Sequence, residues 1–203
     1  FENEGGETYI CGNPPYLGYN RQTDDQKDEL RRIFEARTKN WRSLDYISGW
    51  FGKFADIANR GFSAAFVTTN SACQGEHAAI LWPLLFSEDI GIDFAVPDFR
   101  WGNNATKNAT VTVSIVGISV KNPRDKYLFL GEHRRKVQSI NQYLIEGTPV
   151  PISAASCSIS GMSSMILGNM PKDGGNLILS VDEADQLRTN FPESAKLVFG
   201  FYG

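Results

Sequence analysis

Residues 9–16 read Tyr9-Ile10-Cys11-Gly12-Asn13-Pro14-Pro15-Tyr16, a short apolar run followed at once by two consecutive prolines. Neither proline can continue a helix or a central strand, because proline lacks an N–H and fixes φ. The pair therefore ends a short buried strand, which we expect over residues 9–12, and Pro14 is held extended by the proline after it. Residues 13–16, called the motif turn below, present an amide side chain, free carbonyl oxygens and an aromatic ring from a rigid base.

The groups on the motif turn suit a planar ligand with an exocyclic amine, such as adenine. Adenine N6 is a poor nucleophile, because its lone pair is delocalised into the ring. Two acceptors, the Asn13 side-chain oxygen and the Pro14 carbonyl, would draw this nitrogen toward a tetrahedral, nucleophilic state while Tyr16 stacks on the base. The alternative is a structural loop in which Asn13 caps a turn and Tyr16 is ordinary packing.

Hydrophobic periodicity predicts helices and strands in alternation after the motif turn. We expect a helix over 24–37, capped by Thr23 or Asp24, and a second helix over 43–59 that ends at Gly61. The apolar face of the second helix comprises Leu44, Ile47, Phe51, Phe54 and Ile57. The remaining predicted elements are a strand over 62–68, a helix over 74–86 interrupted by Pro83, and strands over 90–96 and 109–120.

This alternation predicts an α/β open sheet with helices packed on it. The strands over 90–96 and 109–120 follow each other without a helix, which favours an antiparallel edge hairpin. In open α/β sheets, ligands bind beyond the carboxyl ends of the strands. The motif turn and residues 68–71 both follow predicted strands, so we expect two polar loops on one rim of the sheet.

The periodicity fades past Lys121, and Asn122-Pro123 has the character of a boundary. We therefore expect two regions, residues 1–121 and residues 122–203. Residues 148–176 are rich in Ser, Gly, Met and Pro, as linkers are. A short helix is predicted over 181–189, with Ser180 as N-cap and Glu183 at the capping-box position.

Composition limits the classes of protein to consider. The chain has 203 residues, a net charge of −3 and no apolar run long enough to cross a membrane. It shows neither an initiator methionine nor a secretory signal, so we expect an excised piece of a longer protein. Its cysteines are widely spaced and predict no disulfide framework or metal site, which suits a reducing, cytoplasmic compartment. These are Cys11, Cys73 and Cys157.

The overall charge is not that of a nucleic-acid-binding protein, yet basic residues cluster in two places. One cluster lies within residues 27–42 and the other is His133-Arg134-Arg135-Lys136. Either cluster could meet phosphate, and the alternative for each is ordinary solvated surface.

The chain resembles the adenine-N6 DNA methyltransferases, whose motif IV reads Asn/Asp-Pro-Pro-Tyr/Phe after the fourth strand. It is most similar to the large fused restriction–modification methyltransferases of the Type IIL kind. The segments that carry this resemblance are 10–18, 65–76, 80–86, 99–101 and 167–176, so it extends over most of the chain.

The resemblance implies a fold and a reaction. The fold would be the second half of a Rossmann-like class I methyltransferase sheet with helices on both faces, followed by an irregular α+β segment that leads into a target-recognition region. The reaction would be methyl transfer from S-adenosyl-L-methionine to N6 of a flipped adenine in double-stranded DNA, within a restriction–modification system. Asn13, Pro14, Pro15 and Tyr16 match the catalytic motif. Phe99 and Trp101 compete for the second aromatic wall, which the family supplies from the loop after its sixth strand.

One part of the family pattern is absent from this chain. The family binds S-adenosyl-L-methionine through a glycine-rich turn, and neither Gly5-Gly6 nor Gly174-Gly175 has that context. The resemblance thus implies that the cofactor residues belong to a missing N-terminal half of the same protein and that the isolated chain is inactive. Two alternatives remain, a non-catalytic DNA-binding or scaffold module, and methylation of glutamine side chains in proteins through the same turn.

Overall fold

A computed structural model of the chain describes residues 7–101, 111–121, 125–150, 160–161 and 174–200. The chain divides into two compact units, Phe1–Ser153 and Ala154–Gly203. Among the described residues, those of the first unit form a six-stranded sheet and three α-helices, and those of the second form one α-helix.

The sheet of the first unit is mixed, with the strand order β1-β2-β4-β3-β5-β6. β1 is parallel to β2 and β3 is parallel to β5, whereas the other neighbouring pairs are antiparallel. The predicted α/β class is therefore confirmed. The strands are β1 (Tyr9–Gly12), β2 (Ser63–Thr69), β3 (Ile90–Trp101), β4 (Val111–Val120), β5 (Lys126–Leu130) and β6 (His133–Val137).

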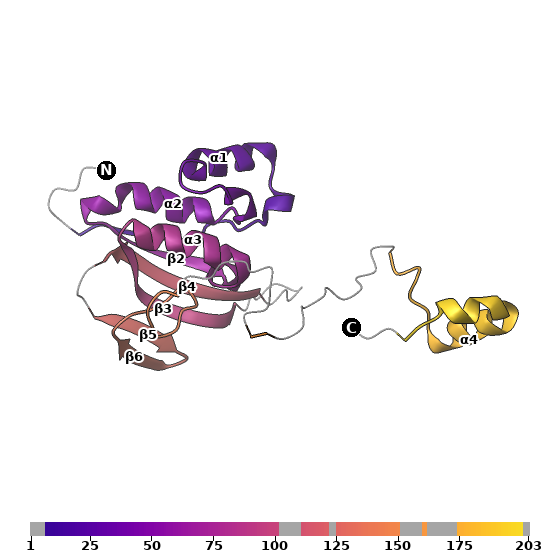
Figure 1. The fold of residues 1–203 in the computed structure, drawn as a ribbon. Coiled ribbons are helices and arrows are strands. Elements are labelled where there is room, and N and C mark those ends of the chain that lie inside the picture. The colour runs from indigo at the N-terminus through magenta and orange to yellow at the C-terminus, as the bar shows by residue number, and fades with distance from the viewer. Residues whose placement is uncertain (1–6, 102–110, 122–124, 151–159, 162–173, 201–203) are drawn as a thin grey trace. The chain divides into compact units, whose positions relative to one another are not determined.

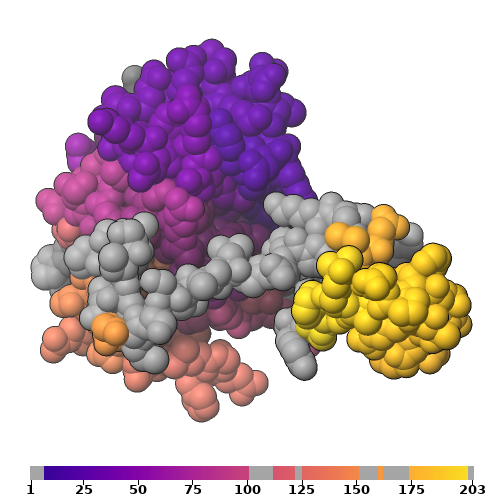
Figure 2. All heavy atoms as spheres, turned by 45° about the vertical axis from the view of Figure 1, so that its right-hand side comes forward, coloured from indigo at the N-terminus to yellow at the C-terminus, as the bar shows by residue number. Residues whose placement is uncertain are grey.

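Three helices lie over one face of this sheet (Figure 1): α1 (Asp24–Phe34), α2 (Ser48–Ile57) and α3 (Gly75–Ser87). The core is formed where they meet the sheet. Phe51 of α2 makes edge contacts with Phe66 of β2 and Trp82 of α3, with ring centroids 5.1 Å and 5.7 Å apart. The space-filling view shows this helical layer and the β5–β6 end of the sheet at opposite ends of the unit (Figure 2). Helices expected on the second face are not among the described residues.

α1 and α2 end at Phe34 and Ile57, three and two residues earlier than predicted. The helices differ from the sequence prediction in two further places. α2 begins only at Ser48, because the Asp45 carboxylate accepts the Ile47 N–H at 3.1 Å and residues 45–50 form tighter 3-10 hydrogen bonds. Leu44 and Ile47 are nevertheless fully buried, as the apolar pattern predicted. α3 continues through Pro83, so the predicted interruption is wrong. Pro83 is exposed while the opposite face of α3 is buried, and this packing offsets the roughly 3 kcal/mol cost of an internal proline.

Other helix signals are confirmed. Thr23 caps α1 in a full capping box with Gln26. Gly61, with φ of 78°, closes the turn after α2. The described residues also form short 3-10 helices, which are η1 (Tyr19–Arg21), η2 (Trp41–Ser43), η3 (Ala58–Arg60), η4 (Asn70–Cys73) and, after α4, η5 (Pro192–Leu197).

β1 forms where predicted, but it is not buried. Tyr9 is 63% exposed and Cys11 is exposed, because β1 is the outermost strand of the described sheet and pairs only with β2. β3 is longer than predicted and reaches Trp101. Its register shifts between Ile92 and Phe94 and again between Val96 and Phe99, and the second irregularity accommodates Pro97.

The antiparallel pairing of β3 with β4 is confirmed, but its predicted position at the edge of the sheet is wrong, because β4 also pairs with β2 and β3 also pairs with β5. The hairpin at the edge is β5–β6, which the sequence pattern did not reveal. β6 consists largely of exposed charged residues, as edge strands often do, and it therefore lacks a hydrophobic alternation.

The boundary expected at residues 122–123 lies outside the described residues, as do most of residues 148–176. The division into functional regions 1–121 and 122–203 stays a prediction. In the second unit, α4 (Val181–Asn190) is the predicted helix, and Ser180 and Glu183 form the predicted capping box.

Candidate functional site

The carboxyl ends of three strands meet at one rim of the sheet. β1 runs parallel to β2, and both β2 and β3 are antiparallel to β4, so β1, β2 and β3 all point the same way. Thr69 of β2 and Phe99 of β3 flank Val113 of β4. The motif turn, η4 and the end of β3 therefore share this rim, which confirms the predicted placement of two polar loops.

One residue of the motif turn is buried and the other three are exposed. Pro14 is buried, whereas Asn13 and Pro15 are exposed and Tyr16 is 41% exposed. The Asn13 amide and the Tyr16 ring are thus accessible to a ligand at the rim. The Tyr16 ring is therefore not packed in the core, and the role of this turn in binding a base stays a prediction.

The two candidates for the second aromatic wall lie in β3 itself and not in a loop after it. Phe99 is half-buried, and Trp101 is the last residue of the strand, described by its backbone only. The loop expected there is replaced by strand because both residues pair with β4, opposite Val113 and Val111. β1 and β3 are three strand spacings apart, about 14 Å. The choice between Phe99 and Trp101 stays open.

A clamp holds the residue that follows the motif turn. The Leu17 N–H donates to the Asp45 carboxylate at 2.8 Å, and the Leu17 carbonyl accepts from the Tyr46 N–H at 3.0 Å. The Gln22 amide also donates to the Leu17 carbonyl, at 2.8 Å, and to the Leu44 carbonyl, at 3.2 Å. Both backbone groups of Leu17 are therefore fixed by the segment before α2.

A buried histidine joins this clamp to the second loop of the rim. His77 Nε2 lies 3.2 Å from the Asp45 backbone nitrogen and 2.6 Å from Ser48 Oγ, and Nδ1 lies 3.3 Å from the Ser71 carbonyl. Asp45, Gln22 and His77 were not predicted from the sequence as parts of the site. Leu17 and Asp45 are 28 residues apart and Asp45 and His77 are 32 apart, so no local pattern could indicate these contacts.

The basic clusters are largely engaged in ion pairs within the chain. Arg37 contacts Asp56 at 2.5 Å and Glu88 at 3.1 Å. In the second cluster, Arg135 contacts Glu146 at 2.9 Å and Lys136 contacts Asp125 at 2.7 Å. These contacts favour the surface interpretation for these side chains. Nearer the motif turn, the Arg42 guanidinium lies 4.5 Å from the Trp41 ring centroid, and Trp41 contacts Tyr19 edge-on.

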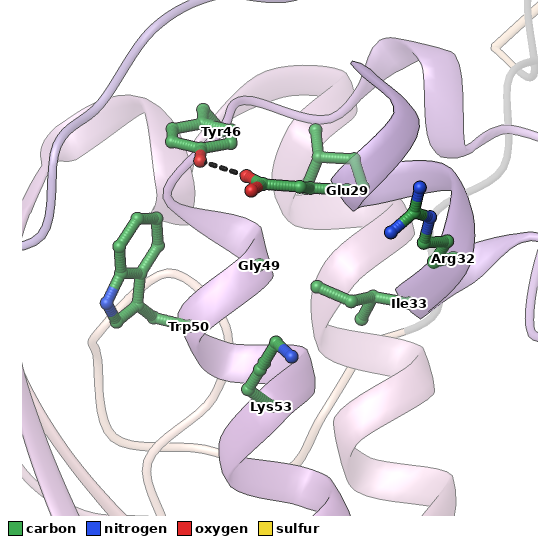
Figure 3. Close-up of a pocket in the computed structure, with 8 residues that line it drawn as sticks. Glu29, Arg32, Ile33, Tyr46, Gly49, Trp50 and Lys53 are labelled. Carbon is green, nitrogen blue, oxygen red and sulfur yellow. Dashed lines mark hydrogen bonds between the residues drawn. The ribbon is translucent and has the colours of Figure 1, made fainter. Parts of the chain in front are cut away.

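A separate groove of about 470 Å³ lies between α1 and α2 (Figure 3). Across it, the Tyr46 hydroxyl donates to the Glu29 carboxylate, and this bond raises the pKa of Tyr46 to about 12, with burial and the Glu29 charge adding to the effect. Arg32 and Lys53 also line it. The groove contains no residue of the motif turn and is not the site predicted from the sequence.

Within the ranges that the structure describes, no His, Cys, Asp and Glu side chains group as metal ligands do, and no helix is long and apolar enough to span a bilayer. Cys73 is buried, which raises the pKa of its thiol to about 12 and leaves it protonated and unreactive.

Comparison with known proteins gives consistent matches in sequence and structure. Residues 2–130 match the family model described as "MmeI, DNA-methyltransferase domain", and residues 146–203 match "MmeI, target recognition domain". The chain is 40% identical over 201 residues, 97% of its length, to a Bacillus subtilis (strain 168) protein named DNA methyltransferase A, of which it covers 22%. It also matches the structure of the Type IIL restriction-modification enzyme MmeI in complex with DNA, with a TM-score of 0.85 and 37% identity. That match covers 93% of this chain and 26% of the MmeI chain. The chain thus spans about a fifth to a quarter of these relatives.

Proposed function

Because this chain belongs to the family of MmeI DNA-methyltransferase domains, we propose that it forms the target-base half of a restriction–modification DNA methyltransferase. The proposed reaction transfers a methyl group from S-adenosyl-L-methionine to N6 of an adenine flipped out of double-stranded DNA. The proposed location is the cytoplasm, where the DNA substrate would be found.

The observation that carries this proposal is the geometry of the motif turn at the rim. Asn13 and Tyr16 are accessible, Pro14 is buried, and Leu17 is fixed from both sides. A turn held in this way keeps its acceptors in place while charge develops on the substrate, so little reorganisation is needed during reaction.

The chain's own residues would bind and activate the base. The Asn13 side-chain oxygen and the Pro14 carbonyl accept the two N6 hydrogens, which localises the nitrogen lone pair for attack. Tyr16 covers one face of the base, and Phe99 or Trp101 covers the other. Bound S-adenosyl-L-methionine supplies an electrophilic methyl carbon. The residues that hold it would come from the N-terminal half of the same protein, since this chain contains no glycine-rich cofactor turn.

The test is Asn13→Ala in the full-length methyltransferase that we propose contains this chain. Methylation should fall by about 10²–10³-fold, the usual effect of removing one positioned polar group. DNA binding should change little, because it depends mainly on phosphate contacts elsewhere. Asn59→Ala is the matched control, since Asn59 is exposed in η3, which precedes β2 and lies away from the rim.

Wild-type methylation by Asn13→Ala would disprove the assignment of the motif turn. If the unaltered full-length protein binds DNA but transfers no methyl group, the alternative of a non-catalytic DNA-binding or scaffold module is correct. Mapping the methylated atom on a DNA duplex distinguishes N6 of adenine from other positions, and a protein substrate in the same assay tests the glutamine alternative.

A further inference from the structure

The imidazole of His77 joins residues 45–48, about 30 positions earlier in the chain, to η4, which precedes α3. This side chain projects from the first turns of α3 and is 8% exposed. Its partners are the backbone of Asp45, the hydroxyl of Ser48 on α2 and the carbonyl of Ser71 in η4. The imidazole therefore connects the clamp on Leu17 to the loop that follows β2.

The contacts determine the protonation state of His77. The Asp45 N–H can only donate, so Nε2 must carry a lone pair and no proton. The Ser71 carbonyl can only accept, so Nδ1 carries the single proton of a neutral ring. A second proton on Nε2 would face the Asp45 N–H and end that hydrogen bond.

The charged surroundings agree with a neutral ring. Burial lowers the pKa of His77 from its ordinary value, and it outweighs the Asp45 carboxylate and the Ser71 carbonyl, which raise it. Ser48, the contact from α2, carries no charge. Glu76, the neighbour of His77 on α3, is exposed and accepts from the Ser43 hydroxyl at 3.2 Å.

We propose that His77 is a positioning residue for methyl transfer, which acts by holding residues 44–48 against η4 so that the Asp45 clamp fixes the motif turn. This inference rests on the proposed function of the motif turn. His77 does not touch the base. Its neutral form keeps the Asp45 N–H in place, Asp45 keeps Leu17 in place, and Leu17 sets the position of Tyr16 and Asn13 relative to the end of β3.

The test uses two variants of His77 and one matched control in the full-length protein. His77→Leu removes both hydrogen-bonding nitrogens. His77→Gln places an amide oxygen near the position of Nε2, where it can accept the Asp45 N–H, and it cannot titrate. The control is His133→Gln, because His133 is the only other histidine of the chain and is exposed on β6.

Misplacement of catalytic groups by a distant change costs up to about 10²-fold in rate, so kcat of His77→Leu should fall by about 10–100-fold. KM for DNA should change little, since no phosphate contact is lost. His77→Gln should restore most of the rate near pH 8. As the pH falls toward the lowered pKa of His77, the rate of His77→Gln relative to wild type should rise, because only wild type can lose its clamp by protonation. The rate of His133→Gln relative to wild type should not change with pH.

Amide hydrogen exchange supplies a readout that does not depend on methylation. The Leu17 and Tyr46 amides should exchange faster in His77→Leu than in wild type, and nearly as slowly as wild type in His77→Gln. Unchanged kcat in folded His77→Leu, or unchanged exchange of its Leu17 amide, would overturn the positioning role. If His77→Leu does not fold, His77→Gln decides the question: a fall in its kcat with unchanged protection of the Leu17 amide would overturn the role. Failure of the proposed function is recognised separately, by full activity of Asn13→Ala.

Discussion

The ring of Phe94 on β3 covers Gly117 on β4 so closely that a Cβ atom at position 117 would stand 2.1 Å from Phe94 Cε1. The two residues are direct neighbours in the antiparallel pair, and Phe94 also makes an edge contact with Phe129 of β5, with centroids 6.1 Å apart. Gly117 thus makes room for an aromatic pair on the face of the sheet opposite the helices.

Gly117→Ala should destabilise the chain, because the added methyl group forces Phe94 from its position. Overpacking of this kind costs about 1–3 kcal/mol. A thermal melt should show a lower midpoint than wild type. Gly18→Ala is the control, since its Cβ would meet no atom within 4 Å and its φ of −59° suits alanine. A Gly117→Ala midpoint equal to that of Gly18→Ala would contradict the packing argument.

The isolated 203-residue chain should not methylate DNA. The reason is the absence of a glycine-rich cofactor turn from its sequence. Incubation with labelled S-adenosyl-L-methionine and DNA should give no transfer above a sample without protein. Clear turnover would mean that the chain binds the cofactor through residues not identified as cofactor ligands.

In the full-length protein, Tyr16→Phe should retain much more activity than Tyr16→Ala. Phenylalanine keeps the ring face, and stacking of one base on an aromatic side chain contributes about 1–3 kcal/mol. A target adenine in a mismatch is easier to extrude, so a mismatched duplex should partly rescue Tyr16→Ala. Methylation rates on matched and mismatched duplexes measure both effects.

The same assay addresses the second aromatic wall. Trp101→Ala should show the mismatch rescue if Trp101 contacts the base, whereas Phe99→Ala, at a half-buried position in β3, should mainly lower the melting midpoint. Equal losses on matched and mismatched DNA would remove the stacking role from both Tyr16 and Trp101.

Stability should depend on pH through His77. The unfolded chain binds a proton on this residue near the ordinary pKa of about 6.5, whereas the folded chain resists protonation because burial lowers the pKa. Below this pH the unfolded state holds more protons, so the contribution of His77 to the free energy of unfolding is complete above about pH 6.5 and is lost as the pH falls. Urea titrations of wild type and His77→Gln should diverge less at acid pH than at neutral pH.

Elements with a local signal were predictable from the sequence. The capping boxes at Thr23 and Ser180 and the glycine stop at Gly61 depend on neighbours a few residues away, and all three are confirmed. The start of α2 was misplaced because Leu44 and Ile47 satisfy helical spacing while the Asp45 side chain captures the Ile47 N–H. The β5–β6 hairpin was not predicted, because β6 carries charged residues where an alternation of apolar and polar residues would have indicated a strand.

The candidate site likewise contains features that have a local sequence signal and features that have none. The rim position of the motif turn followed from strand direction alone. The residues that hold this turn could not be inferred, because the Asp45 and His77 contacts join segments that only the folded chain brings together. The exposure of β1 could not be predicted either. It depends on the position of β1 at the edge of the described sheet and not on the composition of residues 9–12.

The pairing of β1 has a consequence for the order of folding. β3 and β4 are consecutive in the chain, as are β5 and β6, so each pair closes a short loop and can form early. β1 is separated from its partner β2 in the chain by α1 and α2, and it is joined to the sheet along one edge. Its pairing with β2 closes a loop of residues 13–62, which is longer than the loop of residues 70–110 between β2 and β4. Because the motif turn is continuous with β1, we expect it to be completed late in folding.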